Sequence, residues 1–83
     1  NISKTCISAS DIVLSKYESL DHERIFDVKI RYRDPGTPAR CVIVDGILKI
    51  ELLTPKNSIA LGQSVVMYEG DDVVGGGIIS EVE

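Results

Sequence analysis

The sequence is poor in cysteine, histidine and aromatic side chains, and it contains no tryptophan. Its two cysteines, Cys6 and Cys41, have no CxxC spacing and are too few for a disulfide scaffold or a zinc site. One bridge between them remains an alternative, although free thiols are expected in a reducing cytoplasm. The single histidine, His22, lies in a polar stretch without a recognisable metal-ligand spacing. These shortages argue against a metal site and against a catalytic arrangement built on histidine.

Long hydrophobic runs are also missing. No apolar stretch approaches the roughly 20 residues needed to cross a bilayer, so no membrane contact is expected. Residues 1–14 lack the basic region and the unbroken apolar stretch of a signal peptide. The only methionine is Met67, so we expect the sequence to be a piece of a longer protein. A single cytoplasmic domain over residues 1–83 fits these observations, because a chain of this length forms one small core.

Charge is plentiful but unevenly distributed. The formal net charge of −4 disfavours a protein that binds nucleic acid alone, because phosphate contacts need a positive surface. Residues 24–40, however, contain five basic and two acidic side chains, a local net charge of +3. Residues 41–83 contain two basic and seven acidic side chains, a local net charge of −5. One basic stretch therefore belongs to an otherwise acidic chain.

Hydrophobic alternation predicts strands along the first half of the chain. Residues 5–15 are rich in β-branched and small side chains, which favours a strand with a bulge near Ser10 and Asp11. In residues 24–33 apolar side chains alternate with charged ones, so one face of this strand is predicted to enter the core. Two prolines and a glycine in residues 34–38 are expected to end that strand.

A β-hairpin follows, and its register can be derived from its turn. Asp45-Gly46 favours a two-residue type I′ turn, because both positions need a positive φ. With this turn Arg40 lies opposite Glu51, and the other face of the hairpin becomes entirely apolar. Cys41 is thereby predicted to lie in the core as a small hydrophobic residue. The complete apolar face is Ala39, Cys41, Ile43, Leu48, Ile50 and Leu52.

Two more strands are predicted at residues 64–68 and 73–79, on either side of an acidic turn at residues 69–72. Solvated carboxylates are favoured over a metal site in this turn, because no calcium-loop spacing surrounds them. The chain then has about six short strands and no convincing helix, which is typical of a small barrel or sandwich. We predict an all-β fold, a six-stranded antiparallel barrel of Greek-key type, because closure removes exposed strand edges.

Three consecutive glycines, Gly75, Gly76 and Gly77, lie inside the last predicted strand, where glycine is normally avoided. A phosphate-binding loop would need a following Lys-Ser or Lys-Thr pair and a change from strand to helix, and the sequence has neither. Barrel curvature, a bulge or the close approach of another backbone is the favoured interpretation. A direct contact with a ligand is the alternative.

Basic side chains occupy every second position at the end of the strand predicted over residues 24–33. Lys29, Arg31 and Arg33 therefore project from one strand face. They span roughly 13 Å, a distance over which successive phosphates of a nucleic-acid strand run. Taken alone, this stripe favours a solvated outer face, and a row of phosphate contacts is the alternative.

Two sequence segments and their order along the chain help to decide between a solvated strand face and a row of phosphate contacts. Residues 29–33 read Lys-Ile-Arg-Tyr-Arg and precede a proline-containing turn. Residues 62–79 begin with Gly-Gln-Ser, pass through a Tyr-Glu-Gly turn and end in the triple glycine. Together they resemble the C-terminal end of the tRNA-specific 2-thiouridylases, known by an older name as tRNA (5-methylaminomethyl-2-thiouridylate)-methyltransferases. The matching motifs are spread from residue 29 to residue 79, a span that covers most of the chain.

The resemblance implies that the chain is the C-terminal β-barrel of a larger enzyme, similar to the second domain of translation elongation factors. Such an enzyme adenylates the wobble uridine of tRNA with ATP and then transfers sulfur from a cysteine persulfide to carbon 2. The family's Ser-Gly-Gly-x-Asp-Ser nucleotide motif is absent here, so ATP and the persulfide donor are expected to bind the parent's N-terminal and central domains. The barrel is then expected to be non-catalytic and without a cofactor, and Cys6 and Cys41 receive no persulfide role.

For this part of the enzyme, the resemblance implies a contact with tRNA beside the catalytic domains. The implied contact residues are Lys29, Arg31, Arg33 and, as a weaker addition, Arg40. Because the chain is acidic overall, we expect it to bind tRNA only when it is tethered to the other domains, through effective concentration. The alternative is a β-barrel interaction module that packs on neighbouring protein domains without contacting RNA.

Overall fold

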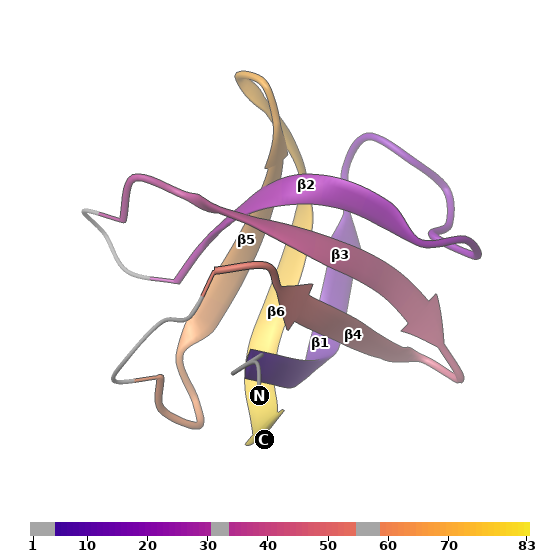
Figure 1. The fold of residues 1–83 in the computed structure, drawn as a ribbon. Helices are drawn as coiled ribbons and strands as arrows, with labels where there is room; N and C mark the ends of the chain where they lie inside the picture. The colour runs from indigo at the N-terminus through magenta and orange to yellow at the C-terminus, as the bar shows by residue number, and fades with distance from the viewer. Residues whose placement is uncertain (1–4, 31–33, 55–58) are drawn as a thin grey trace.

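Six antiparallel strands close into a barrel, in the order β1-β4-β3-β2-β5-β6 (Figure 1). The computed structural model describes residues 5–30, 34–54 and 59–83. Within these residues no helix has the length and apolar character needed to cross a bilayer. The predicted six-stranded antiparallel barrel is confirmed. Its strands are β1 (Thr5–Leu14), β2 (Arg24–Lys29), β3 (Thr37–Val44), β4 (Ile47–Leu52), β5 (Ser64–Glu69) and β6 (Asp72–Val82).

The core is built from the inward-pointing residues of all six strands. Each fully buried aliphatic side chain contributes about 1.5–3 kcal/mol through the removal of apolar surface from water. One end of the core is covered by Leu20, which lies in the loop between β1 and β2 and is only 2% exposed. Its carbonyl accepts a hydrogen bond from the N–H of Ile43 at 2.9 Å, which fixes the loop over the barrel. The largest fully buried side chains are Ile7, Leu48, Ile50, Leu52, Met67 and Ile79.

The hairpin of β3 and β4 has the predicted turn and the predicted register. Asp45 and Gly46 have φ values of 53° and 77°, as a type I′ turn requires. Arg40 lies opposite Glu51. The predicted apolar face is buried except at Ile43, which is partly exposed and packs against the edge of the core. A favoured turn and one apolar face are therefore sufficient to define this pairing.

Strand β2 ends at Lys29, earlier than the strand predicted over residues 24–33. The N–H of Ile30 donates to the Asp34 carboxylate at 2.9 Å, and the N–H of Gly36 donates to the other oxygen of the same carboxylate, also at 2.9 Å. A side chain thus replaces the neighbouring strand as the partner of the Ile30 amide. The alternation of this strand is otherwise as predicted, since Phe26, Val28 and Ile30 are buried. Residues 31–33 lie outside the described residues.

Strand β1 is bulged where the sequence predicts it. Its pairing with β6 shifts between Ser10 and Val13, and Asp11 has a φ of 52°. Aspartate tolerates this left-handed conformation better than most residues do. The extra residue bends β1 toward β6 and helps the barrel to close.

The three glycines of β6 lie where that strand is closest to both neighbours. A Cβ atom on Gly76 would overlap the carbonyl oxygen of Val65 on β5. A Cβ atom on Gly77 would lie 2.6 Å from the carbonyl oxygen of Ser10 on β1, and one on Gly75 would overlap another β1 carbonyl. The interpretation of the glycines as positions of close backbone approach is confirmed.

A polar cluster ties the loop after β1 to the turn between β5 and β6. The Nζ atom of Lys16 lies 2.8 Å from a carboxylate oxygen of Asp72 and 3.0 Å from one of Glu69, and the Tyr17 hydroxyl donates to Glu69. The hydrogen bonds from Tyr17 and Lys16 lower the pKa of Glu69. The hydrogen bond to Glu69 raises the pKa of Tyr17, and those to Asp72 and Glu69 raise the pKa of Lys16. Two carboxylates of the acidic turn are therefore paired rather than simply solvated, which the sequence did not predict.

Replacement of Gly76 by alanine is expected to destabilise the barrel by about 3 kcal/mol, because the new methyl group would force β6 away from β5. Gly62→Ala is the matched control, because a Cβ atom there meets nothing within 4 Å. Gly62 has a φ of 88°, so this control should lose only about 1–2 kcal/mol through backbone strain. Urea unfolding followed by circular dichroism measures both changes, and equal losses would contradict the close-approach explanation.

Replacement of Glu69 by glutamine should flatten the pH dependence of stability at both ends. The lowered pKa of Glu69 gives stability that is present above the unfolded-state value, about 4.3, and is lost as the pH falls through the folded-state value. The raised pKa values of Tyr17 and Lys16 give stability that is present below their unfolded-state values, about 10, and is lost as the pH rises through the folded-state values.

Denaturant midpoints measured from about pH 2 to pH 12 test this pH dependence. The control is Lys49→Gln, which removes a charge outside the cluster and should keep the wild-type profile. Wild-type and Glu69→Gln profiles of the same shape would show that the cluster does not couple the loop to the turn.

Candidate nucleic-acid interface

Lys29 is the predicted contact residue with the clearest surroundings. It ends β2 on the outer face of the barrel, and its Nζ atom lies 4.7 Å from the centroid of the Tyr68 ring on β5. Such a cation–aromatic contact contributes about 0.5–1 kcal/mol at an exposed site. Within the described residues no carboxylate forms an ion pair with Lys29. The nearest acidic residue along β2 is Asp27, two positions earlier on the same strand face.

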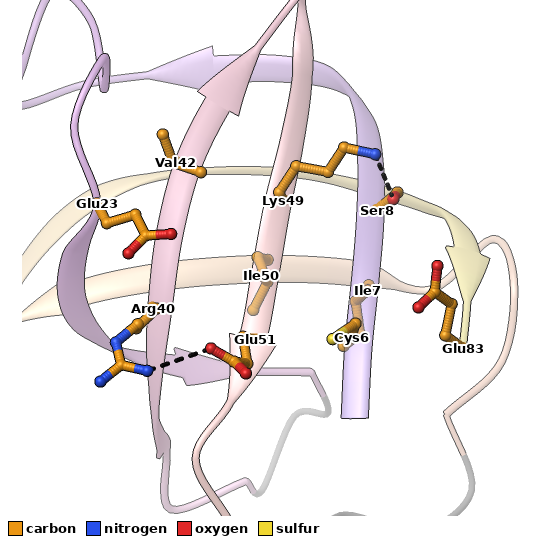
Figure 2. A pocket seen from close by; sticks show the side chains of 10 residues that line it. All are labelled: Cys6, Ile7, Ser8, Glu23, Arg40, Val42, Lys49, Ile50, Glu51 and Glu83. Carbon is orange, nitrogen blue, oxygen red and sulfur yellow. Dashed lines mark hydrogen bonds and ion pairs between the residues drawn. The ribbon is translucent and has the colours of Figure 1, made fainter. Parts of the chain in front are cut away.

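Arg40 differs from Lys29 because it is ion-paired. Its Nη1 atom lies 3.3 Å from a carboxylate oxygen of Glu51 on β4 (Figure 2). This pair is partly exposed, so it contributes at most about 1 kcal/mol. Arg40 lies opposite Ile25 on β2, four residues before Lys29, which separates the two positions by roughly 13 Å along the strand. The structure therefore does not bring Arg40 and Lys29 together.

Arg31 and Arg33, the other two predicted contact residues, lie outside the described residues. In the sequence they follow Lys29 and Ile30 directly and precede Asp34. The part of the predicted interface that the structure describes is thus the outer end of β2 at Lys29.

A second cation, Arg24, lies at the opposite end of β2 and was not among the predicted contact residues. Arg24 is exposed, and its Cζ atom lies 4.5 Å from the centroid of the Tyr17 ring. The Tyr17 ring in turn lies 6.2 Å from that of Phe26 and is thereby held against the edge of the core. Like Lys29, Arg24 forms no ion pair with a described carboxylate. The net charge of +3 over residues 24–40 included Arg24, but only the Lys29 side of the strand showed regular spacing.

Arg40 also lines a hollow of about 190 Å³ on the outer face of β1, β4 and β3 (Figure 2). Lys49 lies in the same hollow, with its Nζ atom 3.3 Å from the Ser8 hydroxyl. The hollow joins the β3–β4 hairpin to β1, which is distant in sequence, and the predicted hairpin register indicated only the hairpin part of it. Among the described residues, two basic and three acidic side chains line the hollow, a net charge of −1 that does not favour phosphate. The acidic residues are Glu23, Glu51 and Glu83.

The cysteines and the three glycines of β6 were the other residues that could have taken part in chemistry. Cys41 is fully buried in the core as predicted, and burial raises the pKa of its thiol to about 12, so it stays protonated at neutral pH. Cys6 is half-buried, and both thiols are free. Residues 75–77 pair with β5 and lie against β1, so they offer no cradle for the phosphates of ATP. In the part of the chain that the structure describes, no three His, Cys, Asp or Glu side chains form a group that could hold a metal ion.

Comparison with known proteins identifies the family. The family model for the aminomethyltransferase beta-barrel domain matches residues 4–79. The tRNA-specific 2-thiouridylase MnmA of Salinibacter ruber is 44% identical over 79 residues, which cover 92% of this chain and 20% of the relative. The enzyme of the same name from Amoebophilus asiaticus is 45% identical over 67 residues, covering 80% of this chain and 18% of the relative.

A third relative, the tRNA-specific 2-thiouridylase MnmA of Clostridium botulinum, is 38% identical over 85 residues, covering 99% of this chain and 23% of the relative. The chain thus spans about a fifth of the length of the curated relatives that it matches. The resemblance stated from the motifs is confirmed. The chain belongs to the aminomethyltransferase beta-barrel domain family, and its relatives are tRNA-specific 2-thiouridylases.

Proposed function

We propose that this chain is the C-terminal barrel of a tRNA-specific 2-thiouridylase and helps to hold tRNA while the rest of the enzyme performs the chemistry. The observation that carries this proposal is the charge of β2. Its two cations, Arg24 and Lys29, have no ion-paired carboxylate among the described residues, and in the sequence the strand leads directly to Arg31 and Arg33. The name of the relatives supplies tRNA as the ligand.

The chemical steps are assigned to the rest of the polypeptide. ATP-dependent activation of the wobble uridine needs a nucleotide site, and the transfer of sulfur from a persulfide donor needs a reactive thiol. The glycines of β6 are occupied by strand pairing, and the Cys41 thiol is buried and protonated. These features support a binding role for the barrel, with ATP and the persulfide donor bound by the N-terminal and central domains. A cytoplasmic location follows from the proposed tRNA substrate.

Phosphate contacts would come from Lys29, Arg31 and Arg33, with Arg40 as a weaker addition. Arg40 must leave Glu51 to reach a phosphate, but the partly exposed pair resists this by at most about 1 kcal/mol. The net charge of −4 opposes tRNA binding by the barrel alone. Tethering overcomes this opposition, because a short connection raises the effective concentration of the barrel beside bound tRNA to about the millimolar range.

A triple variant of the full-length enzyme, with Lys29, Arg31 and Arg33 replaced by alanine, should bind tRNA more weakly. The slope of log affinity against log salt concentration should fall in magnitude by about 2–3, because each lost phosphate contact removes about 0.7–0.9. Lys49→Ala is the matched control, because its hollow has a net negative charge. Fluorescence titrations at several salt concentrations measure both variants.

The rate of 2-thiouridine formation at saturating tRNA should be unchanged in the triple variant, since the three residues bind tRNA rather than react. Wild-type affinity together with a wild-type salt slope would contradict a tRNA contact at Lys29, Arg31 and Arg33. That result would favour the interaction module that packs on protein without touching RNA.

A further inference from the structure

An apolar groove of about 320 Å³ crosses the outer face of β1, β6 and β5, and its β5 side borders Lys29, which pairs with Val66. Its floor is formed by the glycines of β6, because they carry no side chains to fill the space. Val13 on β1 is 67% exposed and Val73 on β6 is 46% exposed at the groove, so two valines remain in contact with water. Val66 and Ile78 complete its apolar lining.

This groove differs from the hollow beside Arg40 in its chemistry. Among the residues that the structure describes, five charged side chains line the hollow, whereas one, Asp11, lines the groove. Asp11 is exposed at the bulge of β1, and no described residue forms an ion pair or hydrogen bond with it. An occupant that matches the groove therefore has an apolar side chain over the glycines and a basic side chain at the Asp11 end.

The length of the family relatives bears on which occupant is available to the groove. The chain corresponds to only about a fifth of the length of these relatives, so the barrel occurs in polypeptides with much more chain outside it. Contacts between domains of one polypeptide are commonly small and partly polar, which suits a shallow groove with one charged end. We propose that the groove is the docking site for another segment of the same polypeptide, extended, apolar at its centre and basic where it meets Asp11.

Thiol labelling of the complete gene product that contains this chain tests the proposal. Val13→Cys places a thiol on the groove, and Val44→Cys, 49% exposed at the turn between β3 and β4, is the matched control. Cys6→Ser is included in all proteins, and Cys41 remains because its buried thiol, with a pKa of about 12, reacts slowly with maleimide. Because the rest of the complete product has reactive thiols of its own, modification is followed at the introduced cysteine by mass spectrometry of its peptide. Each variant is labelled in the complete product and in the 83-residue chain alone.

We expect the thiol of the Val13→Cys variant to be labelled at least about ten-fold more slowly in the complete product than in the 83-residue chain, because labelling then requires the docked segment to open. Val44→Cys should be labelled at the same rate in both. Val73→Cys provides a second position on the groove if the first variant fails to fold.

Equal rates for the groove thiols, or a gene product no longer than this chain, would overturn the proposal. Protection that appears in the isolated chain as its concentration rises would overturn it too, by assigning the groove to a second copy.

Asp11→Asn tests the charge of the occupant. Asparagine preserves the size and the left-handed backbone at this position and removes only the charge. Added to Val13→Cys in the complete product, it should raise the labelling rate several-fold toward that of the isolated chain and reduce its dependence on salt. An unchanged labelling rate would show that the occupant has no basic side chain at Asp11.

Discussion

The close approach of β6 to both of its neighbours is the constraint on which the barrel depends. A closed barrel leaves no strand edge unpaired and lets a chain of this length enclose a core. The bulge of β1 and the glycines of β6 lie along the same seam, with Val13 opposite Gly76 and Leu14 opposite Gly75. The two strands can approach closely because β6 has no Cβ atoms at its glycines and β1 has an additional residue at its bulge. The outer groove is a second consequence, since side chains that are absent for closure also leave space outside.

The basic side chains on the surface of the barrel fall into two groups that differ in the kind of partner they contact. Most described basic side chains contact an acidic side chain or a hydroxyl group. Lys16 contacts Asp72 and Glu69, and Arg40 contacts Glu51. Lys49 contacts the hydroxyl group of Ser8. Strand β2 instead pairs its cations with aromatic rings, Arg24 with Tyr17 and Lys29 with Tyr68. An aromatic ring orients a cation without cancelling its charge. With two cations and Asp27, β2 therefore has a net charge of +1 on a protein that is acidic as a whole.

Features governed by neighbouring residues were predictable from the sequence. The Asp45-Gly46 turn and one apolar face were sufficient for the register of β3 and β4, and the buried position of Cys41 followed from that register. The triple glycine predicted a close backbone approach, because few other structural needs place glycines inside a strand.

Features that depend on side chains meeting across the fold were not predictable. The early end of β2 depends on the carboxylate of Asp34 accepting the Ile30 amide, which alternation does not reveal. The pairing of Lys16 with Asp72 joins residues 56 positions apart. The separation of Arg40 from Lys29 follows from how β3 is aligned on β2, and the sequence alone did not determine that alignment. Arg24 was passed over for the same reason, since its contact with Tyr17 depends on the path of the preceding loop.

The burial of Cys41 has a consequence for any enzyme that carries sulfur as a persulfide. Persulfide sulfur passes readily to a nearby thiolate, so each reactive cysteine close to the carrier is a competing acceptor. The Cys41 thiol is inside the barrel and protonated at neutral pH. It is therefore inert toward such exchange. A barrel with this cysteine in its core can work beside sulfur-transfer chemistry without diverting sulfur through that residue.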